Sequence, residues 1–102
     1  VEEMIKYGYQ AVQHFPKSER HVLSQELRLS MWRLMRLVVV CSKRYHKKTT
    51  LQDLDAELEL LRRQVRAAKT LGVLPFKKYE VWSRYLDEIG RMVGGWIKRA
   101  KG

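Results

Sequence analysis

The chain is poor in cysteine, proline, glycine and long apolar runs, and each shortage excludes a class of protein. Its single cysteine, Cys41, rules out a disulfide within the chain and fits a reducing compartment. Two prolines and six glycines are too few for a turn-rich all-β fold. The longest apolar run, Leu37 to Cys41, is far shorter than the roughly 20 residues of a membrane-spanning helix, so we expect no membrane partner. Glu2 and Glu3 stand where a signal peptide would carry positive charge, so we expect a cytoplasmic location.

Acidic residues are scarce as well. The sequence has 21 lysines and arginines against 11 aspartates and glutamates, which gives a net charge of +10 over 102 residues. A chain of this length is expected to form one domain, residues 1–102, and this charge would surround it with a strong positive field. The field favours a polyanionic partner, nucleic acid first. An anionic membrane surface, an acidic protein and a role in solubility are the alternatives.

Apolar residues repeat every three to four positions in four segments and predict an all-α protein. We expect helices over 2–14 and 17–45, a third helix that Thr49 caps and Gly72 ends, and a fourth that begins at Pro75. Because the connections are short, the expected architecture is an up-down-up-down antiparallel four-helix bundle. The predicted core positions are Met4, Ile5, Gly8, Ala11, Val12, Phe15, Leu23, Leu27, Ser30, Leu34, Leu37, Cys41, Tyr45, Leu51, Leu54, Leu58, Leu61, Val65, Ala68, Tyr79, Trp82, Leu86, Ile89, Val93 and Ile97.

A second apolar stripe lies on the second and fourth predicted helices, away from the core positions. It consists of Trp32, Met35, Val39, Val81, Tyr85, Met92 and Trp96. Exposed tryptophans and methionines in register indicate a subunit or partner interface. The alternative is that neighbouring helices simply cover them. On the fourth helix, Gly90 and Gly94 mark a face on which a neighbouring helix is expected to approach closely, unless these glycines only fray the end of the helix.

Basic residues form three groups. The candidate nucleic-acid contacts are Arg33, Arg36, Lys43, Arg44, Lys47 and Lys48 around the end of the second helix, and Arg62, Arg66 and Lys69 on the third. On the fourth, Lys77, Arg84, Arg91 and Lys98 recur every seven residues, but Glu80 and Asp87 stand between them and are expected to neutralise them in part. The second-helix group has no acidic neighbours on its own helix. We therefore expect the polyanion there first, with a solvated basic face as the alternative.

Motifs for catalysis are missing. His14, His21, His46 and Cys41 have no metal-ligand spacing, and the core stripes carry no paired carboxylates or histidines. There is no glycine-rich phosphate loop following a strand. We therefore expect no enzyme activity, no metal, no cofactor and no small-molecule substrate.

Three stretches resemble a known family. They are Phe15-Pro16-Lys17-Ser18-Glu19-Arg20, Leu71-Gly72-Val73-Leu74 leading to Tyr79-Glu80, and Asp87 to Ile97 with the pattern Glu-Ile-Gly-Arg-x-Val-Gly-x-Trp-Ile. Together they resemble the accessory variability determinant (Avd) proteins of diversity-generating retroelements. They are also similar to the related bundles encoded by intervening sequences in bacterial 23S ribosomal RNA genes. Pro75 stands where the family more usually has a helix-capping serine or threonine.

The resemblance implies a ring-like homopentamer of four-helix bundles encoded by a bacterium, archaeon or phage. It implies binding to a reverse transcriptase and to template RNA and complementary DNA, in a non-catalytic role that supports mutagenic reverse transcription. The alternative is a stand-alone bundle of the ribosomal intervening-sequence type with a structural or RNA-associated role. A reverse-transcriptase gene beside the coding sequence would distinguish the first from the second.

Overall fold

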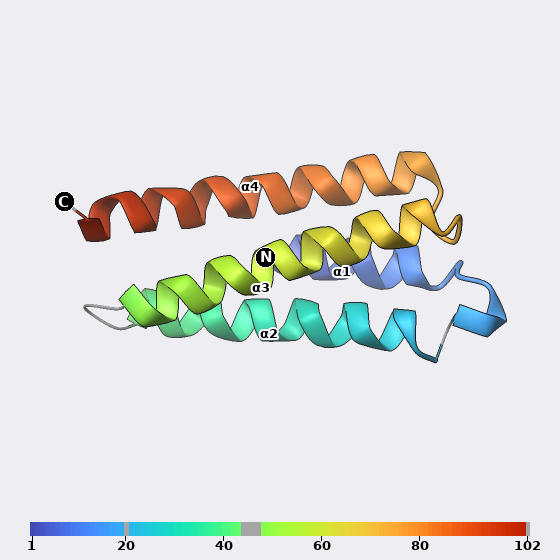
Figure 1. Cartoon of the computed structure of the whole chain (residues 1–102), viewed down its shortest axis with the longest axis horizontal. Helices are drawn as coiled ribbons and strands as arrows, with labels where there is room; N and C mark the ends of the chain where they lie inside the picture. The colour runs from blue at the N-terminus through green and yellow to red at the C-terminus, as the bar shows by residue number, and fades with distance from the viewer. Residues whose placement is uncertain (20, 44–47, 102) are drawn as a thin grey trace.

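The computed structural model describes residues 1–19, 21–43 and 48–101, which form α-helices joined by turns and one short 3-10 helix. The elements are α1 (Glu2–Val12), the 3-10 helix η1 (Lys17–Glu19), α2 (Leu23–Lys43), α3 (Lys48–Thr70) and α4 (Phe76–Lys101). Successive α-helices run in opposite directions along a body of 46 × 22 × 20 Å (Figure 1). Over the described residues this confirms the all-helical fold with four α-helices and no strand.

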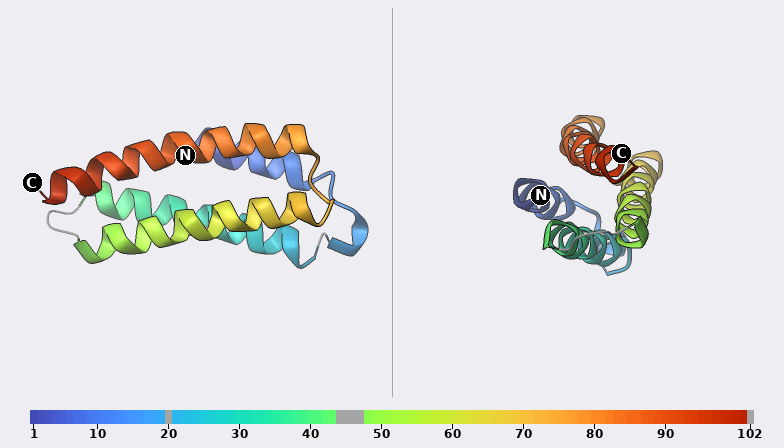
Figure 2. Two further views of the ribbon diagram at one scale, coloured as in Figure 1. Left: turned by 45° about the horizontal axis from the view of Figure 1, so that its top comes forward. Right: turned by 90° about the vertical axis from the view of Figure 1, so that its left-hand side faces the viewer.

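The four α-helices enclose one apolar core. α1 packs against α2 and α4, and α3 packs against the same two helices from the other side, as the end-on view in Figure 2 shows. Trp82 is its largest fully buried side chain, and Leu34, Leu54 and Leu61 are also fully buried. Met31, which the sequence pattern did not place in the core, is fully buried as well. Most predicted core positions are buried, whereas Leu23, Leu37, Cys41, Tyr79 and Ile97 are half-buried at its margins.

The second helix begins later than predicted, at Leu23 rather than at residue 17. Pro16 is followed only by the three-residue η1, and the chain turns again before α2. A short helix is stable in water only if it buries an apolar face. The segment has none to offer, because Lys17, Ser18 and His21 are polar and Val22 is exposed.

The predicted cap of the third helix is also wrong. α3 begins at Lys48, so Thr49 lies inside its first turn and does not cap it. Leu51 is the first core residue of this helix and is buried. The helical turn that starts at Lys48 positions its side chain in the core. Four residues before α3 lie outside the described residues. They are the predicted core residue Tyr45, the candidate contacts Arg44 and Lys47, and His46.

Gly72 ends α3 in a left-handed conformation with φ of 81°. The N–H of Gly72 donates to the carbonyl of Lys69 at 3.0 Å, and that of Val73 to the carbonyl of Ala68 at 3.1 Å. These two bonds form the Schellman arrangement, which places a left-handed residue at the position of Gly72. The predicted end of the third helix is thereby confirmed.

Replacing Gly72 with alanine is expected to destabilise the protein by about 1 kcal/mol, because an L side chain disfavours a positive φ. A Cβ there would meet no atom within 4 Å, so backbone strain is the only cost. Thermal unfolding should show a fall of about 4–8 °C. An unchanged midpoint would mean that the turn adopts another conformation in solution.

Candidate nucleic-acid interface

The α2 cations that the sequence favours share their surface with acidic residues of α3. Arg33 and Arg36 line a shallow groove of about 480 Å³ together with Asp53 and Glu57. Glu57 is fixed there, because the hydroxyl of Ser30 donates to its carboxylate at 2.8 Å. The prediction that this group has no acidic neighbours on its own helix does not extend to the folded bundle, because α3 brings Asp53 and Glu57 beside it. The two carboxylates reduce the positive potential beside both arginines.

The remaining cations of this group lie at the ends of α2 and α3. Lys43, in the last turn of α2, and Lys48, the first residue of α3, are both exposed. Arg44 and Lys47 lie outside the described residues. The structure therefore places two cations at the same end of the bundle, where α2 stops and α3 starts (Figure 1).

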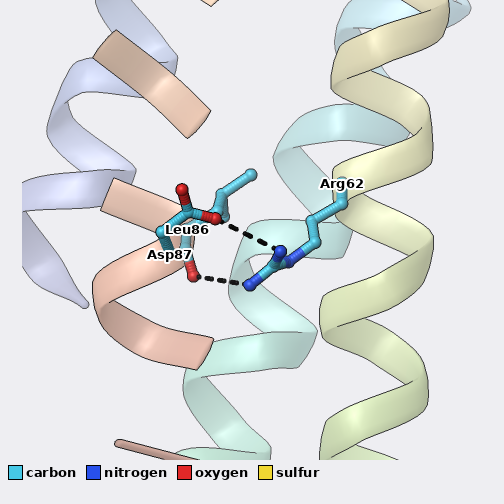
Figure 3. A network of polar contacts seen from close by, with 3 residues as sticks. All are labelled: Arg62, Leu86 and Asp87. Carbon is cyan, nitrogen blue, oxygen red and sulfur yellow. Dashed lines mark hydrogen bonds and ion pairs between the residues drawn. The ribbon is translucent and has the colours of Figure 1, made fainter. Parts of the chain in front are cut away.

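Two of the three predicted α3 contacts are engaged in packing the helices. A guanidinium nitrogen of Arg62 lies 3.2 Å from a carboxylate oxygen of Asp87, and another donates to the backbone carbonyl of Leu86 at 3.4 Å (Figure 3). The ammonium of Lys69 lies 4.5 Å from the ring centroid of Tyr79. Both cations thus join α3 to α4. Of the three, only Arg66 is exposed.

Four basic residues of α4 form an exposed stripe along the helix. Lys77, Arg84, Arg91 and Lys98, which we call the α4 ridge, are all exposed. The sequence predicts that Glu80 and Asp87 neutralise this stripe in part. The carboxylate of Asp87 pairs with Arg62 of α3 instead, whereas Glu80 is exposed on α4. Over the described part of the chain the ion pairs are Arg62–Asp87 and Arg63–Glu59, so no cation of the ridge is held by a carboxylate.

The spacing of the α4 ridge suits a long polyanion. Seven residues of helix advance about 10.5 Å, so the four cations span roughly 32 Å in a nearly straight line. A nucleic-acid strand carries phosphates at closer intervals than the ridge carries cations, one every 3.4 Å along the axis of a duplex, so the ridge is long enough to contact several phosphates. Such contacts neutralise phosphates without reading bases.

The predicted interface stripe is partly covered by α1. The indole N–H of Trp32 donates to the hydroxyl of Tyr9 at 2.8 Å, and the rings of Tyr85 and Tyr7 lie 5.7 Å apart. Burial, and secondarily the neighbouring Tyr85, raises the pKa of Tyr7 above its ordinary value. Trp32 and Val39 still remain 50% and 49% exposed. The other members, Met35, Val81, Tyr85, Met92 and Trp96, are half-buried.

No neighbouring helix backbone lies as close to the two α4 glycines as the sequence suggests. A Cβ on Gly94 would meet no atom within 4 Å, so this prediction is wrong for the bundle itself. A Cβ on Gly90 would clash with the guanidinium of Arg62, which is the flexible end of a side chain and not a helix backbone.

The close approach lies instead at Gly8 of α1. A Cβ there would collide with Met31 and would lie 2.9 Å from a ring carbon of Trp82. The heptad pattern places Gly8 on the inner side of its helix, but its spacing does not reveal the large partners opposite. The sequence signal that could have predicted this contact is a glycine in the core stripe of one helix together with a bulky core residue, Trp82, on another.

Within the described ranges no three histidine, cysteine, aspartate or glutamate side chains gather as metal ligands do. None of the described helices combines the length and hydropathy needed to cross a bilayer.

The protein is thus a basic, antiparallel four-helix bundle with an exposed row of cations along α4. Residues 1–100 match the sequence model of the family described as bAvd-like, and the chain therefore belongs to the bAvd-like family. This confirms the resemblance to the Avd proteins. The family consists of accessory proteins and is not a known enzyme family. No curated protein matches the chain.

Proposed function

We propose that this chain is a non-catalytic accessory subunit of a diversity-generating retroelement. In this role it binds the reverse transcriptase together with template RNA and complementary DNA, and supports mutagenic reverse transcription. The observation that carries the proposal is the family match over residues 1–100. The net charge of +10 and the exposed α4 ridge support a polyanionic partner.

The same proposal includes a homo-oligomer, a ring-like pentamer as the family resemblance implies. Large apolar side chains outside the α1 contacts are available for subunit contacts. They are Val22, Leu29, Leu60, Leu71 and Phe76, each more than 40% exposed. Burial of such residues between subunits would remove apolar area from water, which is the usual driving force of assembly.

Light scattering of the purified protein, with and without a short RNA–DNA hybrid at moderate salt, tests the proposal. The expected result is a species of five chain masses that gains the mass of the hybrid. A monomer or dimer indifferent to the hybrid would favour the stand-alone bundle of the ribosomal intervening-sequence type. The enzyme contact is tested separately by co-purification with the reverse transcriptase encoded beside the chain, when there is one.

A further inference from the structure

Trp32 is a large aromatic residue that the fold holds in place at the surface. Its side chain is 50% exposed, yet its indole N–H donates to the hydroxyl of Tyr9 at 2.8 Å. The two rings meet nearly edge to face, with centroids 6.4 Å apart and planes at 74°. Tyr9 lies near the C-terminal end of α1, so this contact is made within the packed pair of α1 and α2. The orientation of the half-exposed indole is therefore fixed before any partner binds.

Arginines flank Trp32 one helical turn away on either side. Arg28 and Arg36 stand four residues before and after it, each at a rise of about 6 Å and a rotation of about 40°, so the three side chains form one line along α2. The guanidinium of Arg28 lies 5.9 Å from the ring centroid of Tyr9, which places it on the same aromatic pair. Carboxylates of α3 reduce the potential beside Arg36, whereas Arg28 belongs to neither of the ion pairs between described residues. The positive charge of Arg28 is therefore available to a ligand that contacts Trp32.

Acidic groups do not cancel this charge. Glu26 is the only acidic residue of α2, Leu23–Lys43, and it lies about 120° away from Trp32 around the helix. On α1, Glu2 and Lys6 both line the hollow beside Trp32, so their charges offset each other. The surface around Trp32 thus combines an aromatic side chain with a surplus of positive charge.

A fixed aromatic surface beside a cation suits an unpaired nucleobase. The base stacks on the indole while the neighbouring phosphate meets the guanidinium, the combination by which proteins bind single strands without reading sequence. A duplex offers its phosphates in the same way, but its bases are stacked on one another inside the helix. α1 and α3 each pack against both α2 and α4, so α2 and α4 stand at diagonal corners of the bundle (Figure 2). The α4 ridge and Trp32 are therefore separate surfaces that suit different forms of nucleic acid.

We propose that Trp32 and Arg28 form a stacking site for an unpaired base of a single-stranded nucleic acid. The site rests on the nucleic-acid partner of the proposed function and specifies which form of that partner α2 contacts. Every base has an aromatic face, so the site accepts RNA or DNA and has little sequence preference. A template strand is unpaired where it has not yet been copied, and that is the form that such a site binds.

The test compares two substitutions that both remove the indole N–H. Trp32→Leu keeps an apolar side chain but has no aromatic face, whereas Trp32→Phe keeps a ring. Fluorescence anisotropy with short labelled oligouridine and oligothymidine should show that Trp32→Leu weakens binding about tenfold or more, and that Trp32→Phe weakens it clearly less. Val39→Ala is the matched control, because Val39 is 49% exposed on the same helix and its replacement should leave the affinity unchanged.

A salt titration with the same strands separates stacking from charge. Arg28→Gln should lower the slope of log affinity against log salt by about 0.7, the value for one phosphate contact of a single strand. Trp32→Leu should lower the affinity at every salt concentration and leave the slope unchanged, because stacking releases no counterions. Circular dichroism and light scattering check that the variants keep the fold and the mass of the parent protein.

Three results would overturn the stacking site. The first is equal affinity of Trp32→Leu and Trp32→Phe for both strands, because the aromatic face would then contribute nothing. The second is an absence of single-strand binding by the parent protein. The third is a smaller mass of free Trp32→Leu, which would assign Trp32 to a subunit contact. A loss of affinity confined to one strand would keep the site and restrict it to RNA or to DNA.

An RNA–DNA hybrid, measured with the same proteins, distinguishes failure of the site from failure of the proposed function. Trp32→Leu should bind the hybrid as tightly as the parent does, because the hybrid has no unpaired base to stack. If the parent binds the hybrid but not the single strands, the site is wrong and the proposed function stands. If it binds neither, the polyanionic partner of the proposed function is wrong as well.

Discussion

Replacing Arg84 and Arg91 with glutamine is expected to weaken binding to an RNA–DNA hybrid about 60-fold at 0.1 M salt. The expectation follows from counterion release: each phosphate contact contributes about 0.9 to the slope of log affinity against log salt. Loss of two contacts therefore lowers the slope by about 1.8, while the affinity extrapolated to 1 M salt stays the same. A salt titration followed by fluorescence anisotropy measures both quantities. Both residues are exposed, so the fold is expected to survive.

The matched control is Arg33→Gln combined with Arg36→Gln, which removes the same two charges from α2. Asp53 and Glu57 line the groove beside these arginines, so the local potential is already reduced. The salt slope is expected to fall by clearly less than in the α4 variant. If the control loses as much affinity as the α4 variant, binding depends on the net charge of the protein and not on the α4 ridge. If only the control loses affinity, the polyanion lies on α2, where the sequence alone places it.

The heptad pattern predicts the fold well because burial and helix periodicity depend on neighbouring residues of the same helix. Leu34, Leu54 and Trp82 fall on stripes with three-four spacing, and all three are fully buried. The start of α2 is less predictable, since Lys17 and Ser18 have acceptable helix propensity and only the lack of an apolar face leaves them in a 3-10 turn. Tertiary packing thus decides helix ends that propensity leaves open.

The charged surface is harder to predict, because it depends on the register between helices. Asp87 stands between basic residues of its own helix, and the sequence alone suggests that it neutralises them. In the folded chain it reaches Arg62 of α3, which also contacts the carbonyl of Leu86. The spacing of residues within α4 cannot predict this contact, because Arg62 belongs to α3. The same holds for Arg33, whose acidic neighbour Asp53 comes from another helix.

A substitution at Gly8 is the second change for which we expect a large effect, here on stability. Gly8→Leu is expected to destabilise the protein by about 3 kcal/mol or more, because added side-chain volume in a packed core forces strain. Met31 has a flexible side chain and can move in part. Trp82 is fully buried with its ring 2.9 Å from the site of the new Cβ, and its indole N–H has no hydrogen-bond partner within the described part of the chain. Packing alone positions that ring, so a side chain at Gly8 displaces the centre of the core.

Gly94→Leu is the matched control, because it makes the same chemical change on an exposed helix position with open space around it. Leucine has a higher helix propensity than glycine, so this variant is expected to be as stable as the parent or more stable by up to about 1 kcal/mol. Urea unfolding followed by circular dichroism should therefore move the two midpoints in opposite directions. If Gly8→Leu does not fold at all, Gly8→Ala provides a milder version of the same clash and should still be less stable than Gly94→Ala. Equal destabilisation by both leucine variants would show that a second surface packs against Gly94, whereas a neutral Gly8→Leu would mean that α1 does not rest on Trp82 in solution.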